Sequence, residues 1–237
     1  MSAEKDAIRR KIWGLMEEKG VTEFPKPVFG RIPNFVGAEN AALRLCQQIE
    51  YQGAEVVKVN PDAPQRPVRM KVLLDGKKLL MPTPRLRKGF MVLDPDEVPR
   101  ESYSRASTIK GTFRYGKLAP LQELPRVDLI VTGSLAVAKD GVRIGKGGGY
   151  SEIEYGVLRE IGAVNEETPI FTTIHDLQIV DEAPAEPHDL TMDAVITPTT
   201  VIRVNRRSGR PSGVFWDSLK ERQLEDIPIL VELSIDR

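Results

Sequence analysis

Apolar residues recur along the chain with two spacings, one typical of helices and one typical of strands. Ile8, Ile12 and Leu15 or Met16 fall at helical spacing, which predicts an amphipathic helix over 2–19. The same spacing predicts further helices over 38–52 and from about 152 to 161. Short β-rich runs predict strands at 54–60, 70–74, 78–81, 129–131, 170–174, 179–180, 194–197 and 201–204.

Several stretches fit neither spacing. The segment 21–37 is rich in Pro and Gly and is predicted to be an extended connection. The segment 94–116 has little periodicity, which predicts a long irregular loop with one helical turn at most. In the tail, Trp216 begins a predicted short helix, and 227–233 is predicted to be an edge strand because Pro228 stands near its start.

Strands that alternate with helices predict an α/β fold with a mainly parallel sheet flanked by helices. In such a sheet a ligand binds outside the carboxyl ends of the strands. A length of 237 residues fits a single α/β domain over 1–237, in which 201–237 is expected to be a C-terminal extension packed on the rest.

The stretch 139–155, KDGVRIGKGGGYSEIEY, combines glycines with basic residues between a predicted strand and a predicted helix. Glycines let successive backbone N–H groups turn toward one anion, and the positive end of the following helix adds to the site. Neither the Walker pattern nor the dinucleotide fingerprint is present. The pattern alone therefore leaves a structural turn open beside a phosphate site. Ser151 and Glu154 have the spacing of a capping box.

Composition narrows the possible partners. Lys plus Arg and Asp plus Glu both total 34, so the net charge gives no support to nucleic acid as the main partner, although a local contact stays open. Cys46 is the single cysteine and is predicted to be a small buried residue. With only two histidines, a structural zinc site is not expected. No apolar run reaches the roughly 18–20 residues of a membrane span, and a cytoplasmic location is expected.

Two polar clusters each allow two interpretations. His188 and Asp189, with Asp193 nearby, could be acid and base groups, or could brace a loop through hydrogen bonds to backbone. The tail cluster could be an exposed hairpin, or could contact a substrate carboxylate or RNA. That cluster consists of Arg206, Arg207 and Arg210.

Three segments, in order, resemble the 5-formyltetrahydrofolate cyclo-ligase family, also called methenyltetrahydrofolate synthetases. Lys5 and Ile8-Arg9 are similar to the family's Lys-x-x-Leu-Arg start. GVRIGKGGGYSE at 141–152 looks like the family loop G-x-R-L-G-[RK]-G-x-G-Y-Y-D. EPHDLTMDAVIT at 186–197 is very like E-P-H-D-x-x-x-D-x-[IV]-[IV]-T. The RIPNF element and the tail resemble a variant, cyclo-ligase-related subgroup.

The resemblance implies a three-layer α/β fold of the kind shared with sugar-phosphate isomerases and CoA transferases. It also implies ATP and Mg²⁺ as cofactors, and a formylated folate or related pterin as the small-molecule substrate. In the family, ATP phosphorylates the formyl oxygen of 5-formyltetrahydrofolate, and N10 attacks the activated carbon. Phosphate leaves as 5,10-methenyltetrahydrofolate closes. This chemistry needs positioning and charge neutralisation more than a protein nucleophile.

The resemblance also implies roles for particular residues. The expected catalytic residues are Arg143, Lys146 and Tyr150. The expected ATP contacts are Lys5, Arg9, Arg143, Gly145, Lys146, Gly147, Gly148, Gly149 and Tyr150. The expected substrate contacts are Pro82, Arg85 and His188, and the expected metal ligands are Glu152 and Asp189.

Departures from the family pattern keep alternatives open. Gly148 stands where the family has a second basic residue, and Ser151-Glu152 stands in place of Tyr-Asp. One alternative is a catalytically inactive, cyclo-ligase-like protein that binds a nucleotide or pterin, with or without RNA. The other is a phosphate-ligand isomerase of the same fold class.

Overall fold

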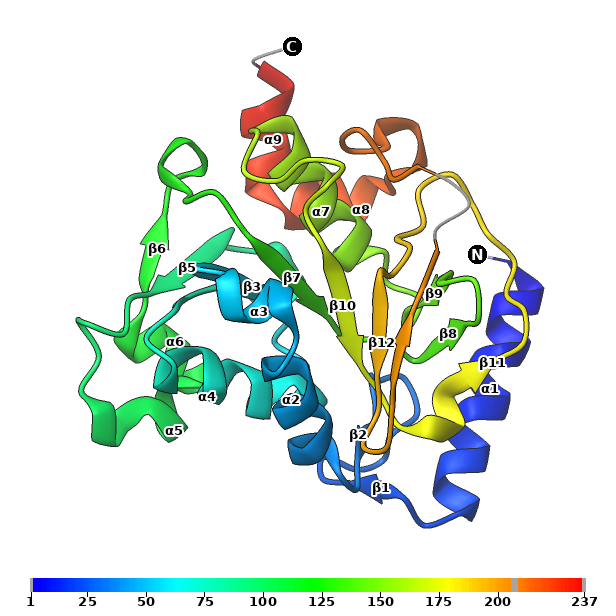
Figure 1. Ribbon diagram of the computed structural model, residues 1–237. Helices are drawn as coiled ribbons and strands as arrows, with labels where there is room; N and C mark the ends of the chain where they lie inside the picture. Colours follow the sequence, from blue (N-terminus) through cyan, green and yellow to red (C-terminus); the bar gives the residue numbers. More distant parts are fainter. Residues whose placement is uncertain (1, 206–208, 236–237) are drawn as a thin grey trace.

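An eight-stranded sheet forms the centre of the computed structural model, which describes residues 2–205 and 209–235 (Figure 1). Its strand order is β13-β12-β10-β7-β3-β4-β5-β6. The strands from β12 to β4 are parallel, and β13, β5 and β6 are antiparallel to their neighbours. The bounds are β3 Val56–Val59, β4 Lys78–Pro82, β5 Phe90–Leu93, β6 Lys117–Ala119, β7 Leu129–Thr132, β10 Ile170–Thr173, β12 Ala194–Ile196 and β13 Val201–Arg203. The predicted α/β class with a mainly parallel sheet is confirmed.

Two small sheets lie outside the central one. Strand β1 (Thr22–Glu23) pairs with β2 (Asn34–Phe35). A three-stranded sheet has the order β11-β8-β9, with bounds β11 Ile179–Val180, β8 Ala136–Ala138 and β9 Arg143–Ile144. The β8–β9 hairpin therefore stands between the buried strand β7 and the glycine-rich loop. Arg143 belongs to β9, not to the loop.

Helices cover both faces of the sheet, which gives three layers (Figure 1). Helices α2 and α4 lie on one face, and α7 and α9 lie on the other. The bounds are α1 Ala3–Glu18, α2 Ala38–Cys46, α3 Ile49–Gly53, α4 Arg66–Leu74, α5 Tyr103–Ala106, α6 Ile109–Tyr115, α7 Tyr150–Glu160, α8 Glu221–Asp226 and α9 Pro228–Ile235. Short 3-10 turns are η1 Ala63–Gln65, η2 Pro84–Leu86, η3 Arg100–Ser102, η4 Leu121–Glu123, η5 Asp176–Gln178 and η6 Trp216–Ser218.

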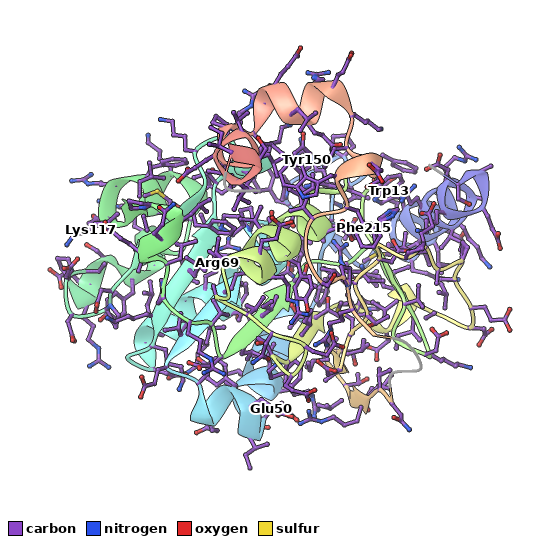
Figure 2. All side chains as sticks on the ribbon, turned by 90° about the horizontal axis from the view of Figure 1, so that it is seen from above. Trp13, Glu50, Arg69, Lys117, Tyr150 and Phe215 are labelled. Atoms are coloured by element: carbon purple, nitrogen blue, oxygen red, sulfur yellow. The ribbon has the colours of Figure 1, made fainter. Side chains whose placement is uncertain are left out.

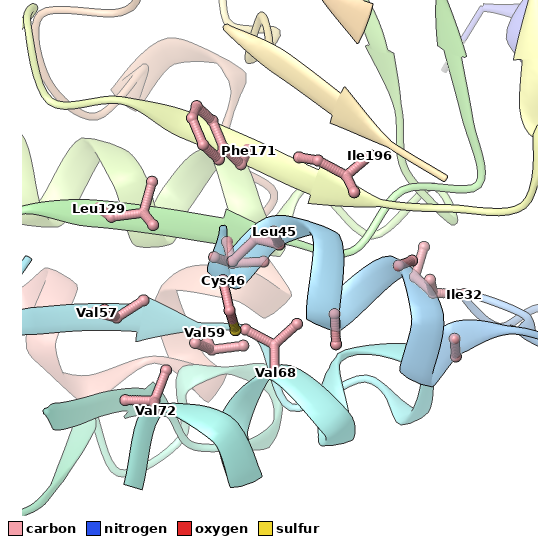
Figure 3. Packing of buried hydrophobic residues seen from close by; sticks show 14 of the residues in the cluster. Ile32, Leu45, Cys46, Val57, Val59, Val68, Val72, Leu129, Phe171 and Ile196 are labelled. Carbon is pink, nitrogen blue, oxygen red and sulfur yellow. The ribbon is translucent and has the colours of Figure 1, made fainter. Parts of the chain in front are cut away.

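The two hydrophobic cores follow from the alternation of side chains along the central strands. Val57 of β3 packs into the core under α2 and α4, while its neighbour Val56 joins the core under α7 and α9. Figure 3 shows Leu45, Cys46 and Val72 facing the strands of the first core. The prediction that Cys46 is a small buried residue is confirmed, and burial raises the pKa of its thiol to about 11.

The predicted strand at 70–74 is wrong, because these residues end helix α4. Val68, Val72 and Leu73 are buried at helical spacing, and Pro67 stands at the helix start, where a missing N–H costs nothing. A short apolar run fits a strand or a helix equally well. Residues 70–74 form a helix because they lie in the connection between the parallel strands β3 and β4, and such a crossover usually contains a helix.

Two further predictions fail for related reasons. The segment 94–116 contains η3, α5 and α6 in place of an irregular loop. The segment 227–233 belongs largely to α9, and Leu230 and Leu233 are buried three positions apart, as on one helix face. Helix 38–52 is broken into α2 and α3. The helix predicted from about 152 begins at Tyr150 instead.

The capping box expected at Ser151 and Glu154 does not form. Gly149 is the N-cap of α7, in a left-handed conformation and without a side-chain cap. Ser151 and Glu154 instead point to partners on β3 and β9 that are described below. Within the described ranges, none of the helices has the length and apolar character required to cross a bilayer.

Candidate active site

A cavity of about 1210 Å³ opens at the carboxyl ends of the central strands. Its wall includes Asn60, which follows β3, and Arg85, which follows β4. The start of α7 and the start of α1 also line it. This is the edge of a parallel sheet where ligands are expected to bind.

Most of the predicted site residues line this one cavity. They are Lys5, Arg9, Arg85, Arg143, Gly145, Lys146, Gly147, Gly148, Gly149, Tyr150, Glu152, His188 and Asp189. Pro82 is the exception, because it lies inside β4 and pairs in register with Phe90 of β5. Its place on the cavity wall is taken by Pro84.

The glycine-rich loop has a backbone that other residues would not readily adopt. Gly147 and Gly149 have φ values of 97° and 71°. A Cβ on Gly148 would stand 2.8 Å from the Tyr150 ring. The loop therefore exposes backbone rather than side chains to the cavity. It leads into the positive end of the eleven-residue helix α7, an arrangement suited to an anion.

Helix α1 connects this loop to the Pro187-His188-Asp189 segment. The Lys5 ammonium lies 2.5 Å from Glu186 Oε2 and 2.6 Å from Asp189 Oδ2. One turn later, Arg9 Nε donates to the Gly145 carbonyl at 2.8 Å. The hydrogen bond from Lys5 holds the pKa of Glu186 below its ordinary value. The contacts bring together three segments that are distant in sequence.

Arg143 is buried beneath the loop and is engaged with the protein. Its Nη2 and Nε donate to the Gly133 carbonyl at 2.6 and 2.9 Å. Its Nη1 lies 2.6 Å from Glu152 Oε1, and Nη2 also reaches Ser151 Oγ at 3.1 Å. This geometry orients the start of α7. Lys146 is different, because its side chain is 42% exposed and pairs with Asp62 Oδ1 at 3.0 Å.

A buried polar network supports the same helix and was not predicted. Lys58 Nζ lies 2.6 Å from Glu154 Oε2 and 2.7 Å from Asn60 Oδ1. Asn60 Nδ2 donates to Ser151 Oγ at 3.2 Å. Burial raises the pKa of Glu154, and Lys58 opposes that shift. A lysine in the centre of the apolar strand VVKVN was the sequence signal, since an unpaired buried ammonium is rare.

The expected metal ligands are both already paired with cations. Asp189 accepts from Lys5, and Glu152 accepts from Arg143. Glu186, His188 and Asp189 offer ligand atoms within 4.8 Å of one another. A divalent cation among them would compete with the Lys5 ammonium for the same oxygens.

His188 lies between Phe215 of the tail and Glu186. The His188 ring meets the Phe215 ring edge-on at a centroid distance of 6.0 Å, and its Nε2 is 3.9 Å from Glu186 Oε2. Asp189 Oδ2 accepts from the Glu186 backbone N–H at 2.7 Å, which is the hydrogen bond expected if this segment braces a loop.

In the tail cluster, Arg210 is buried, so the exposed-hairpin interpretation is wrong for this residue. Arg206 and Arg207 lie outside the described residues.

Several cavity residues come from the C-terminal part of the chain and were not predicted. They are Phe215, Ser218, Leu219, Lys220 and Gln223. In Figure 2, Phe215 and Tyr150 appear on the same side of the molecule, away from Lys117. No motif marks these residues, because their position depends on how the tail packs on α7.

Known proteins match most of the chain. Residues 1–198 match the sequence profile of the 5-formyltetrahydrofolate cyclo-ligase family. Methenyltetrahydrofolate synthase domain-containing proteins are similar over nearly the whole chain, with 42% identity over 233 residues in Mus musculus and 40% over 237 residues in Homo sapiens. These alignments cover 97% and 98% of this chain but 63% and 62% of the relatives. The chain thus spans less than two-thirds of their length.

A solved structure gives the same fold. The 5,10-methenyltetrahydrofolate synthetase of Aquifex aeolicus aligns with a TM-score of 0.54 at 16% identity, covering 91% of this chain and 99% of that one. The profile match covers most of the chain and includes the Lys5 helix, the glycine-rich loop and the Pro187-His188-Asp189 segment. The chain therefore belongs to the 5-formyltetrahydrofolate cyclo-ligase family.

Proposed function

We propose that the protein converts 5-formyltetrahydrofolate to 5,10-methenyltetrahydrofolate at the cost of ATP, releasing ADP and phosphate. One observation carries the proposal. The Lys5–Arg9 turn, the glycine-rich loop and the Glu186–Asp189 segment line one cavity, and the turn contacts both of the other segments directly. A phosphate cradle and a polar wall thus face the same volume.

The cavity residues suit a reaction that depends on positioning and charge. The backbone of Gly147 to Gly149 and the start of α7 would hold the phosphates, with the partly exposed Lys146 beside them. Arg143 and the Lys58–Glu154 pair would fix that helix start from beneath. Arg85 and His188 would contact the folate. Tyr150 would line the cavity between the folate and the phosphates.

The cavity residues fit a nucleoside triphosphate better than a metal ion that only protein side chains hold. The glycine backbone leaves room for phosphate oxygens, where a Cβ at Gly148 would already crowd Tyr150. Magnesium usually keeps several waters and binds phosphate oxygens with one or two carboxylates. Glu152 or Asp189 would be that carboxylate, once it released Arg143 or Lys5.

Two experiments test the proposal: an assay for the methenyl product, and ATP binding after substitution of Lys146. Protein mixed with Mg-ATP and 5-formyltetrahydrofolate should generate the absorbance of the methenyl product. Lys146→Ala should weaken ATP binding by about 1 kcal/mol, or about fivefold in Kd, because the exposed cation is lost and Asp62 keeps its charge in the cavity. Lys139→Ala is the control, since Lys139 is exposed and pairs with Asp181 away from the cavity. No methenyl product from the wild type at high enzyme concentration would refute the proposed reaction.

A second function is favoured by the ion pairs of the cavity. Lys5, Arg9 and Arg143 all have protein carboxylate partners, so none is free to follow charge that develops during phosphoryl transfer. That arrangement suits a protein that binds a nucleotide or pterin without turnover. Calorimetric binding of ATP combined with absence of product would select this function.

A further inference from the structure

The segment 209–235 forms one wall of the cavity although it lies beyond the residues that match the family profile, 1–198. It contributes Phe215, Lys220 and Gln223 to that wall. In Figure 1 its helices α8 and α9 lie beside α7, the helix that follows the glycine-rich loop. The family profile therefore does not account for the whole boundary of the site.

Buried contacts fix this segment on the core. Arg210 is fully buried, donates to the carbonyls of Glu166, Thr168 and Thr191, and pairs with Asp193. Further along, Glu160 Oε1 on α7 accepts from the Val214 backbone N–H and from Trp216 Nε1, both at 3.0 Å. Leu230 and Leu233 then enter the core beneath α7. The segment is a built part of the cavity wall rather than a loose tail.

The segment 209–235 also contacts the glycine-rich loop directly. Gln223 Nε2 donates to the Gly148 carbonyl at 3.1 Å. A Cβ on Gly149 would stand 3.5 Å from the same amide nitrogen. Lys220 lies one turn before Gln223, and its backbone N–H donates to Gln223 Oε1 at 2.9 Å. Lys220 also lines the cavity, so its cation stands on the wall that Gln223 joins to the loop.

Lys220 differs from the other cations near the loop in being unpaired. Lys5, Arg9, Arg143 and Lys146 each have a carboxylate partner at hydrogen-bond distance. Among the residues that the structure describes, Lys220 forms no ion pair. A cation that must leave a carboxylate gains little from an incoming anion. Lys220 is exposed and has no such partner to leave, so it gains all of the solvent-screened attraction.

We propose that Lys220, presented by the segment 209–235, binds the phosphates of the nucleotide at the glycine-rich loop, so that the C-terminal segment is part of the ATP site. The inference rests on the proposed use of ATP, but not on turnover. It assigns Gln223 the role of a positioning residue, because its two hydrogen bonds join Lys220 to the Gly148 carbonyl. The ligand class is a polyphosphate anion, and the adenosine moiety is not required for this contact.

Calorimetry with Mg-ATP, inorganic tripolyphosphate and adenosine tests the assignment. Lys220→Ala should raise the Kd of both polyphosphates about fivefold to tenfold, Lys220→Glu should raise it further, and Lys220→Arg should stay near the wild type. Adenosine affinity should not change. Lys117→Ala is the matched control, because Lys117 is an exposed lysine on the far side of the molecule in Figure 2.

The outcomes separate this inference from the proposed function. Equal polyphosphate affinity of Lys220→Ala and the wild type would overturn the role of Lys220, whether or not methenyl product forms. An equal loss for adenosine would also overturn it, since that result indicates a displaced wall rather than a lost charge. A wild type that binds tripolyphosphate without forming product would overturn only the proposed reaction. A wild type that binds neither polyphosphate would overturn both.

Discussion

Gly156 lies in the middle of α7 where the C-terminal segment crosses the helix, and its replacement by alanine tests that contact. A Cβ at this position would stand 2.8 Å from the Gly213 carbonyl oxygen and from the N and Cα of Val214. These are backbone atoms, so the contact cannot be relieved by a side-chain rotation. The segment 209–235 must move away from α7, or the helix must shift.

Two opposing effects set the magnitude. Alanine is favoured over glycine in a helix interior by about 1 kcal/mol. Overpacking a closely packed position costs about 1–3 kcal/mol. We therefore expect Gly156→Ala to lower the free energy of unfolding by about 1 kcal/mol, since the steric term outweighs the helix propensity.

Gly14 provides a control with the same chemical change. It lies within α1, and a Cβ there would meet nothing within 4 Å. Gly14→Ala should therefore raise the free energy of unfolding by about 1 kcal/mol, which separates the two variants by about 2 kcal/mol. Urea unfolding followed by far-UV circular dichroism measures both. Hydrogen exchange over 209–235 should accelerate only in Gly156→Ala. Equal stabilisation by the two substitutions would refute the close contact.

The buried ion pair and one histidine give two further predictions. Lys58→Met should cost about 3–5 kcal/mol of unfolding free energy, because it leaves the buried Glu154 carboxylate without its ammonium. Adding Glu154→Gln should recover part of that loss in urea unfolding, and no recovery would contradict the pairing. Burial lowers the pKa of His175 below 6.5, and the charge of Asp176 opposes that shift. The neutral ring is also the form that accepts a hydrogen bond, since its Nδ1 accepts from the Leu177 N–H at 3.1 Å. Its stabilising contribution is therefore complete above pH 6.5 and is lost as the pH falls below that value. His175→Asn keeps an acceptor but does not titrate, so unfolding from about pH 7.5 to pH 5 should show a smaller loss than in the wild type.

Periodic patterns in the sequence were sufficient for the central strands and for helices α1 and α7. The runs around Val57, Leu129 and Phe171 form the interior of the sheet because continuous apolar segments must be covered on both faces. The glycine-rich loop was also evident, since the left-handed backbone at Gly147 and Gly149 favours glycine. Local chemistry of this kind depends on neighbours in sequence.

Short apolar runs were decided by tertiary context. Residues 70–74 and 227–233 have compositions that suit a strand, yet both segments pack as helices against the sheet. The first must cross between two parallel strands, and the second packs on the sheet face that α7 also covers. A run of five to seven residues carries too little periodicity to separate these cases.

For the cavity, too, some features could be predicted from the sequence and others depended on the tertiary structure. The sequence by itself indicated which segments line the cavity, because Lys5, the glycine-rich loop and the Pro187-His188-Asp189 segment have recognisable residue patterns. Only the tertiary structure decided their partners, since Lys5 and Glu186 are 181 positions apart and Lys58 and Glu154 are 96 apart. The physical reason is that charge pairing and burial are properties of distance in space, and folding creates those distances. The C-terminal wall belongs to this second class, because it becomes part of the site only by packing on α7.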